Sequence, residues 1–418
     1  MRILIVGLNY APEQVGIAVY TTGMAEALAL KGHEVRVVAG QPYYPGWRIM
    51  AGFSAWGWSK RTENGVTITR VPHYIPNQPT GKKRVIHHAT FAASSLLPAL
   101  WQGAVWRPDV VLAVAPSLIG APVARLAAFF AGARNWLHIQ DFEVEAAFAA
   151  GLLKQGGRLE KLARGFERWV LGSFDRVSAI SPEMCRRLVA KGVPNERVTE
   201  FRNWADVDAI RPSSGPSPYR DLWNIETPHV ALYSGNIANK QGIEVVIEAA
   251  RLLEGRRDLT FVICGDGPKL GSLRELAEGL SNVQFRDLQP KERLNDLMGL
   301  ATIHLLPQLA GAADLVLPSK LANMLASGRP VIATAMDGTG LARELEGGGE
   351  LVSPDDPQAL ASTISALLDD AQKRAEYGIA CRKRADDAWA KGNILDGFAD
   401  RLLRLAADGG HSTRVLLK

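Results

Sequence analysis

Cysteine is scarce in this 418-residue chain: Cys185, Cys264 and Cys381 are three in number and lie far apart. An odd, widely spaced set provides neither a disulfide framework nor the paired spacing of a zinc site, which favours a reducing, cytoplasmic environment. The N-terminal segment MRILIVGLNY also lacks a long apolar run, because the run stops at Gly7, too early for a signal peptide or a membrane span. We expect this segment to be the first strand of a sheet.

Acidic residues are few in the first half of the chain. Residues 1–205 hold 14 Asp and Glu against 24 Lys and Arg, a net charge of +10, whereas residues 206–418 hold 29 against 24, a net charge of −5. A net positive charge in only one half indicates that this half meets an anionic surface. Random variation of surface residues is the alternative explanation.

The glycine pattern of a dinucleotide site is missing from the first predicted strand–helix turn. The turn GLNYAPEQVGIA lacks the glycines of GxGxxG, and no acidic residue ends the following strand at Ala39. An NAD-dependent enzyme is therefore disfavoured.

Strands and helices alternate along the chain. RILIVGL, HEVRVVA, PDVVLAVA and NWLHI are apolar strands separated by helical patterns, and a second such series begins at HVALYSG after a Pro- and Ser-rich segment near residue 205. The length suits two domains of roughly 200 residues each. We predict an α/β fold of two Rossmann-like, doubly wound domains facing across a cleft, with ligands at the carboxyl ends of the strands. The domains are placed at residues 1–205 and 206–385, followed by a helical tail, 386–418, that packs back on the first domain.

Five motifs resemble those of the retaining family 4 glycosyltransferases, in the family's order over nearly the whole chain: GLNYAPEQVGIAVYT, ISPEMCRRLVAKGVPNERVTEFRNWADVDAIRP, YSGNIANKQGIEVVIEAA, ICGDGP and PSKLANMLASGRPVIA. The resemblance implies a GT-B fold, with the acceptor bound by the first domain and a nucleotide sugar by the second. It further implies transfer of a sugar such as fucose to a polyprenyl-diphosphate-linked oligosaccharide, in exopolysaccharide or capsule biosynthesis. No nucleic acid partner is expected.

The segment PSKLANMLASG places a lysine in the first turn of a predicted helix that begins at Pro318. A cation there opposes the helix dipole unless an anion binds nearby, and the diphosphate of a leaving nucleotide is such an anion. We therefore expect Lys320 to act in catalysis beside Ser319. The resemblance assigns Asn323 to a position where the family has a ribose-binding glutamate, and Asp314 is the nearest acid to the family's other glutamate.

Further donor-binding residues are expected at glycine turns. The amides of Gly16 and Ile17 can face a phosphate at a helix entrance. The resemblance implies a diphosphate lysine at Lys240 and an asparagine, Asn236, where the family often has arginine. The flanking turns add the glycines Gly235 and Gly265.

The motif LHIQD ends a predicted strand of the first domain. The resemblance places His138 at the transferred sugar, and we include Asp141 beside it as a catalytic candidate. A histidine with a purely structural hydrogen bond is the alternative.

Asp206 and Asp208 spell a DxD pattern, which can hold a divalent cation in other proteins. Because the family neutralises the leaving group with cations and helix ends, we expect no metal ion and no cofactor besides the nucleotide sugar.

Residues 81–101, GKKRVIHHATFAASSLLPALW, join three basic residues to an apolar stretch of interfacial length. We expect Lys82, Lys83 and Arg84 to dock the first domain on the anionic inner face of the cytoplasmic membrane, with Phe129 and Phe130 adding apolar contact. Helices that merely cover the sheet are the alternative.

Two alternative functions remain open for the whole protein: a nucleotide-sugar 2-epimerase of the same fold and a catalytically inactive membrane-bound scaffold.

Overall fold

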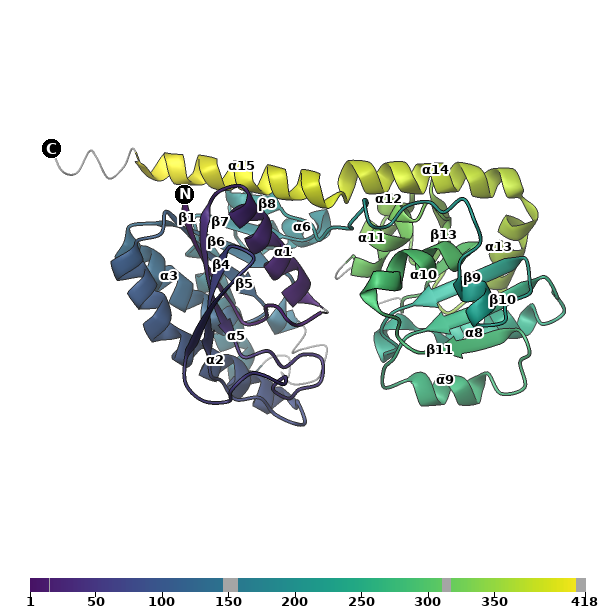
Figure 1. Ribbon diagram of the computed structural model, residues 1–418, viewed down its shortest axis with the longest axis horizontal. Coiled ribbons are helices and arrows are strands. Elements are labelled where there is room, and N and C mark those ends of the chain that lie inside the picture. Colours follow the sequence, from purple (N-terminus) through teal and green to yellow (C-terminus); the bar gives the residue numbers. More distant parts are fainter. Residues whose placement is uncertain (15, 146–156, 310–316, 411–418) are drawn as a thin grey trace. The chain divides into compact units, whose positions relative to one another are not determined.

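The computed structural model describes residues 1–14, 16–145, 157–309 and 317–410 (Figure 1). The chain forms two compact units. Unit 1 comprises Met1–Arg202 with the chain from Leu395 onward, and unit 2 comprises Asn203–Ile394. The change of unit at residue 203 falls at the start of the Pro- and Ser-rich region that the sequence analysis placed between the two series of strands.

The unit 1 sheet has the strand order β3-β4-β2-β1-β5-β6-β7-β8 among the described residues. All pairs are parallel except the antiparallel pair of β3 with β4. The strands are β1 (Arg2–Gly7), β2 (Glu34–Gly40), β3 (Ser59–Glu63), β4 (Val66–Val71), β5 (Val110–Ala115), β6 (Arg134–Ile139), β7 (Arg176–Ala179) and β8 (Val198–Glu200). The central strand β5 is buried along its whole length, as expected for a parallel sheet covered on both faces.

The helices of unit 1 follow from the apolar spacing of their sequences. Those within the described ranges are α1 (Ile17–Leu30), α2 (Gly81–Trp101), α3 (Ala121–Ala131), α5 (Arg158–Gly172) and α6 (Pro182–Ala190). The last helix, α15 (Lys391–Gly410), enters unit 1 at Leu395. Its Phe398 stacks on Phe201 with ring centroids 4.0 Å apart and meets Trp136 edge-on at 5.2 Å. These rings anchor the C-terminal helix to unit 1.

In the part of unit 2 that the structure describes, a six-stranded parallel sheet has the order β11-β10-β9-β12-β13-β14. Its strands are β9 (His229–Ser234), β10 (Leu259–Cys264), β11 (Val283–Arg286), β12 (Ile303–Leu306), β13 (Val331–Thr334) and β14 (Gly349–Val352). Successive residues of β9 point to opposite faces. Val230 and Leu232 therefore join one core, and Ala231 and Tyr233 join the other.

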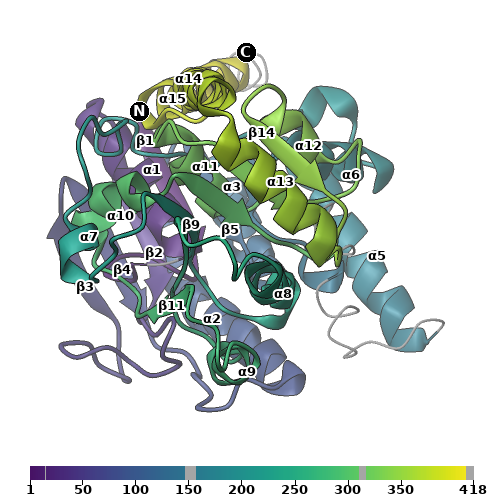
Figure 2. The ribbon, with the colours of Figure 1, turned by 90° about the vertical axis from the view of Figure 1, so that its right-hand side faces the viewer.

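Helices cover both faces of this sheet (Figure 2). The core that holds Val230 includes residues of α7 (Tyr219–Leu222), α10 (Leu294–Leu300), α11 (Ser319–Ala326), α12 (Gly340–Leu345) and α14 (Ala371–Ala388). The core that holds Ala231 includes residues of α8 (Glu244–Leu252), α9 (Leu270–Leu276) and α13 (Pro357–Asp369). Two apolar layers around a parallel sheet confirm the predicted α/β class.

Two local features differ from the sequence prediction. The hairpin of β3 and β4 was missed, although its turn, Asn64-Gly65, has positive φ at both residues and is a strong hairpin signal. The prediction that α11 begins at Pro318 was wrong by one residue, because Pro318 is the extended N-cap and Ser319 is the first helical residue. No described helix is both long and apolar enough to cross a membrane.

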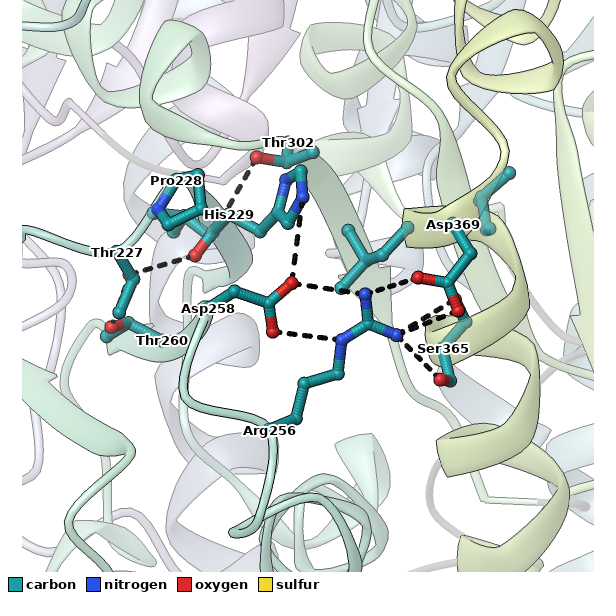
Figure 3. Close-up of polar contacts among 12 residues, drawn as sticks. Thr227, Pro228, His229, Arg256, Asp258, Thr260, Thr302, Ser365 and Asp369 are labelled. Atoms are coloured by element: carbon teal, nitrogen blue, oxygen red, sulfur yellow. Dashed lines mark hydrogen bonds and ion pairs between the residues drawn. The ribbon is translucent and has the colours of Figure 1, made fainter.

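An ion-pair network lies at the amino ends of β9 and β10 (Figure 3). The guanidinium of Arg256 binds both carboxylate oxygens of Asp258, at 3.0 and 3.1 Å, and reaches Asp369 of α13 at 2.6 and 3.1 Å. It also donates to the Ser365 hydroxyl at 2.7 Å. Hydrogen bonds from Arg256 lower the pKa of both carboxyl groups. The network joins α13 to the sheet edge opposite the strand ends that carry the predicted site.

We expect Arg256→Ala to lower the melting temperature by about 3 °C, because a paired guanidinium at the surface contributes modestly. Since the carboxyl pKa values are depressed in the folded state, this stabilisation is present above the unfolded pKa of about 4 and is lost as the pH falls further. Thermal melts from pH 7 to pH 3 should therefore show the difference from wild type shrinking. Arg257→Ala, at an exposed neighbour, is the control. If the difference in melting temperature between Arg256→Ala and wild type grew as the pH fell, the stabilising role given to the Arg256 ion pairs would be contradicted.

Candidate functional site

Two turns meet at the carboxyl edge of the unit 2 sheet. Gly235 follows β9, Gly265 follows the neighbouring strand β10, and the Gly235 amide donates to the Cys264 carbonyl at 2.9 Å. A Cβ on Gly265 would lie 1.9 Å from the Gly235 carbonyl oxygen, and the φ of Gly265 is +157°. Only glycine fits this conformation and this spacing. The structure thus brings two predicted donor-binding glycines into contact.

Lys320 reaches the same turns from the second position of α11. Its Nζ donates to the Tyr233 hydroxyl at 2.8 Å and lies 3.2 Å from the place that a Gly235 Cβ would occupy. The Tyr233 hydroxyl in turn donates to the Asn236 carbonyl at 2.6 Å. A cation, a helix N-terminus and a glycine turn therefore converge, an arrangement that suits an anion. The sequence analysis did not predict a role for Tyr233, because a tyrosine in an apolar strand has the same pattern as an ordinary buried core residue.

The remaining donor-binding candidates of unit 2 are Asn236, Asn323, Ser319, Lys240 and Asp314. The Asn236 side chain is exposed, and Asn323 is half-buried one turn after Lys320 on α11. For Ser319 and Lys240 only the backbone is described, in α11 and in the 3-10 turn Asn239–Gln241. Asp314 lies outside the described residues. The donor-binding roles of these residues stay predictions.

In unit 1, the loop after β1 delivers Gly16 and Ile17 to the start of α1. Gly16 is the N-cap with φ 67°, and Ile17 is the first helical residue. The buried carboxylate of Glu13 holds this loop by accepting from the amides of Tyr43 and Tyr44 at 2.8 and 2.9 Å, and from Asn9 Nδ2 at 3.0 Å. Burial raises the pKa of Glu13. Glu13 was missed since sequence alone does not show its partners 30 residues away.

His138 lies near the carboxyl end of β6, where the sequence predicted it. The ring is 2% exposed and stands 4.8 Å from the Phe201 ring centroid. Its Nδ1 lies 2.9 Å from the Ser178 hydroxyl and its Nε2 lies 3.0 Å from the Gln140 amide nitrogen. Because that amide nitrogen can only donate, the hydrogen-bond network assigns the ring proton to Nδ1. Burial lowers the pKa of His138 to about 3, so the ring is neutral at pH 7. Contact with a sugar stays a prediction.

Asp141 is exposed just after β6, and its catalytic role likewise stays a prediction. The neighbouring Glu143 carboxylate accepts from the amides of Ser117 and Leu118, the latter at 2.9 Å, at the entrance of α3. Burial, reinforced by the charges of Asp141 and Glu167, raises the pKa of Glu143 to about 7. Glu143 is thus tied to the turn after β5.

The DxD carboxylates bind neighbouring residues of the same turn. Asp206 accepts from the Ala209 amide at 3.1 Å, and Asp208 pairs with Arg211 at 3.2 Å. Among the described residues, no group of three or more His, Cys, Asp or Glu side chains is placed to hold a metal ion.

Comparison with known proteins connects these features to a family. The Glycosyl transferase 4-like domain family matches residues 15–204, and the Glycosyl transferases group 1 family matches residues 228–370. An Escherichia coli (strain K12) protein, "Putative colanic acid biosynthesis glycosyl transferase WcaI", is 41% identical over 417 residues, covering 95% of this chain and 98% of the relative. The chain belongs to the glycosyltransferases.

Solved structures share the fold of this chain. Sucrose-phosphate synthase from Thermosynechococcus elongatus has a TM-score of 0.75 at 17% identity, covering 97% of this glycosyltransferase and 99% of that chain. HepE from Anabaena, in complex with UDP, has a TM-score of 0.69 at 16% identity, covering 97% and 100%. At such identities the likeness shows the fold, and the predicted GT-B class is confirmed.

The basic segment predicted to dock on a membrane forms the start of α2 in this glycosyltransferase. Lys82 and Arg84 are exposed, and Lys83 is half-buried. Beyond them, α2 exposes a set of apolar side chains: Val85, Ile86, Leu97 and Trp101. On α3, Phe129 and Phe130 are also exposed, at 77% and 54%. These residues therefore do not all cover the sheet.

A second amphipathic surface lies on α5, at the edge of unit 1 (Figure 2). Leu159, Leu162 and Trp169 are 69%, 69% and 52% exposed, and Phe166 contacts the Trp169 ring at 5.9 Å. Their spacing of three and four residues forms one stripe along the helix. Exposed basic residues flank the stripe: Arg158, Lys161 and Arg168. The sequence analysis missed this surface, although the spacing is visible in RLEKLARGFERW.

Proposed function

We propose that this glycosyltransferase moves a sugar, such as fucose, from a nucleoside diphosphate donor to a polyprenyl-diphosphate-linked oligosaccharide, with retention at the anomeric carbon. The product would enter an exopolysaccharide such as colanic acid. Unit 2 would hold the donor and unit 1 the acceptor. No metal ion or further cofactor is needed, since Lys320 and the α11 amides can neutralise the leaving diphosphate.

The convergence of Lys320, Gly235 and Gly265 at the carboxyl edge of the unit 2 sheet is the observation that supports this proposal most. Negative charge grows on the diphosphate as the sugar bond breaks, so a fixed cation there stabilises the transition state more than the ground state. The relatives add support: the E. coli relative is named for colanic acid biosynthesis, and HepE was also solved with UDP-glucose.

Incubation with a panel of UDP- and GDP-sugars tests the proposal. We expect slow hydrolysis of one donor without acceptor, faster consumption with a polyprenyl-diphosphate glycan, and an anomeric configuration in the product that matches the donor. Release of a free 2-epimer from UDP-GlcNAc would instead favour the epimerase. Absence of turnover with every donor, together with retained membrane binding, would favour the inactive scaffold.

The acceptor cannot leave the bilayer, so the enzyme must come to the membrane. We propose peripheral binding at the anionic inner face of the cytoplasmic membrane through α2, with α5 as a second contact. Both helices combine exposed apolar side chains with basic residues, the pattern of an interfacial helix. Basic residues near such a surface contribute about 1 kcal/mol each, decaying over roughly 10 Å at 0.1 M salt.

We expect replacing Lys82, Lys83 and Arg84 together with alanine to weaken binding to acidic-lipid vesicles roughly 100-fold, in line with three basic residues. Vesicle sedimentation over a salt series measures this, and wild-type binding should weaken with salt without vanishing. The control replaces three exposed basic residues of unit 2, Arg257, Arg274 and Lys291. A second variant, Leu162→Ser with Trp169→Ser, tests α5. Wild type that stays in the supernatant at low salt would contradict the membrane assignment, and unchanged pelleting of either variant would exclude its helix.

A further inference from the structure

Tyr233 joins the candidate donor turn to Lys320. Its ring is fully buried in the core that contains α8 and α13, and it is the last apolar position of β9. Its hydroxyl lies at the site: the oxygen is 2.8 Å from Lys320 Nζ and 2.6 Å from the Asn236 carbonyl oxygen. One group therefore touches both the cation and the glycine turn.

Chemistry sets the direction of these two hydrogen bonds. An ammonium can only donate and a carbonyl can only accept, so the hydroxyl accepts from Lys320 and donates its own proton to Asn236. Burial raises the pKa of Tyr233, which keeps that proton in place at neutral pH. Lys320 Nζ also lies 4.1 Å from the ring centroid, within the range of a cation–π attraction.

We propose that Tyr233 is a positioning residue that holds Lys320 Nζ and the Gly235–Asn236 turn in the geometry that receives the donor diphosphate. The inference rests on the proposed donor site. A lysine side chain is a long, flexible stem, and a free one would spread its charge over many positions. Held by a rigid buried ring, the charge acts without reorganising during the reaction. Precise placement matters more here because Asn236, where the family often has arginine, adds no charge.

Tyr233→Phe tests this role, since it keeps the ring and removes only the hydroxyl. We expect kcat/KM for the donor to fall roughly 10- to 100-fold, the usual effect of losing a hydrogen bond to a charged group. The matched control is Tyr219→Phe, another fully buried tyrosine of unit 2, whose hydroxyl donates to Gln289 at 3.0 Å. It should lose comparable thermal stability and keep wild-type turnover. Equal turnover loss in both variants would overturn the proposal, because the effect would then be structural.

A double-mutant cycle separates positioning from general destabilisation. If Tyr233 acts in part through Lys320, Tyr233→Phe should lower UDP or GDP affinity, measured by calorimetry, clearly more in the wild-type background than in Lys320→Ala, where only the bond to the turn is lost. Equal losses in the two backgrounds, or unchanged affinity and turnover in Tyr233→Phe, would overturn the inference while leaving the donor site standing. If the wild type binds neither UDP nor GDP, the proposed donor site is itself wrong and the inference fails with it.

Discussion

Replacing Lys320 with alanine is expected to lower kcat by about two orders of magnitude and to change folding far less. The ammonium lies beside the Gly235 turn and the N-terminus of α11, where the leaving diphosphate is proposed to sit. Losing one preorganised stabiliser of developing charge costs about 3 kcal/mol in the barrier. Initial rates with the donor identified by the panel, beside thermal melts, measure both quantities.

The control for this prediction is Lys269→Ala, which removes another lysine of unit 2 that pairs with Glu244 at 3.3 Å near the surface. It should retain wild-type kcat. Wild-type turnover in a correctly folded Lys320→Ala protein would contradict the role given to Lys320.

Gly265→Ala is expected to destabilise unit 2 by about 3 kcal/mol or more and to abolish donor binding. The new Cβ would lie 1.9 Å from the Gly235 carbonyl oxygen, a backbone atom that cannot rotate away. The φ of +157° adds strain of about 1–3 kcal/mol for any residue with a side chain. The two turns must therefore separate, and Gly235 would move away from Lys320. Chemical denaturation and calorimetric titration of UDP and GDP measure the two effects.

Gly271→Ala serves as the matched control. Gly271 lies in α9, and no heavy atom lies within 4 Å of its Cβ position. Alanine in a helix is favoured over glycine by roughly 0.5–1 kcal/mol, so this variant should be as stable as wild type or more so. If Gly265→Ala behaves like Gly271→Ala, the close contact of the two turns is not required for binding.

That the candidate residues of unit 2 share one edge of the sheet was predictable, because parallel strands end at a common edge. YSGN and CGDG follow neighbouring strands, and the PSK motif opens the helix after β12, so alternation of strands and helices already places Gly235, Gly265 and Lys320 on that edge. Their mutual distances were not predictable. These depend on the close packing of two glycine turns and on the rotamer of a long lysine.

Departures from the family pattern were also visible in the sequence. The contact that positions Lys320 was not. By the resemblance, Asn236 stands where the family often has arginine and Asn323 where it has glutamate, which reduces the charged groups at the proposed donor site. The structure shows what holds Lys320 in place: the hydroxyl of Tyr233. Period-two alternation predicts that Tyr233 is buried, whereas only the three-dimensional packing brings its hydroxyl to the strand end beside α11.

Glu13 and His138 show that in unit 1, too, the sequence did not predict which polar groups meet. Glu13, in a loop with Pro and Gly, had no distinguishing pattern, yet it binds amides of the loop after β2. His138 was predicted at a strand end, and it is there, but its burial and its bonds to Ser178 and Gln140 depend on the neighbouring strand β7.

The sequence by itself determined the α/β class, the strand–helix order, the glycosyltransferase resemblance and the edge of each sheet that carries the candidate residues. These follow from local periodicity and from turn chemistry, which act over a few residues. Only the tertiary structure decided which polar groups meet: Lys320 with Tyr233, Glu13 with Tyr43, and Arg256 with Asp369. Such contacts join residues about 30 to 113 positions apart, and their geometry is set by the packing of whole helices against the sheet rather than by any local preference.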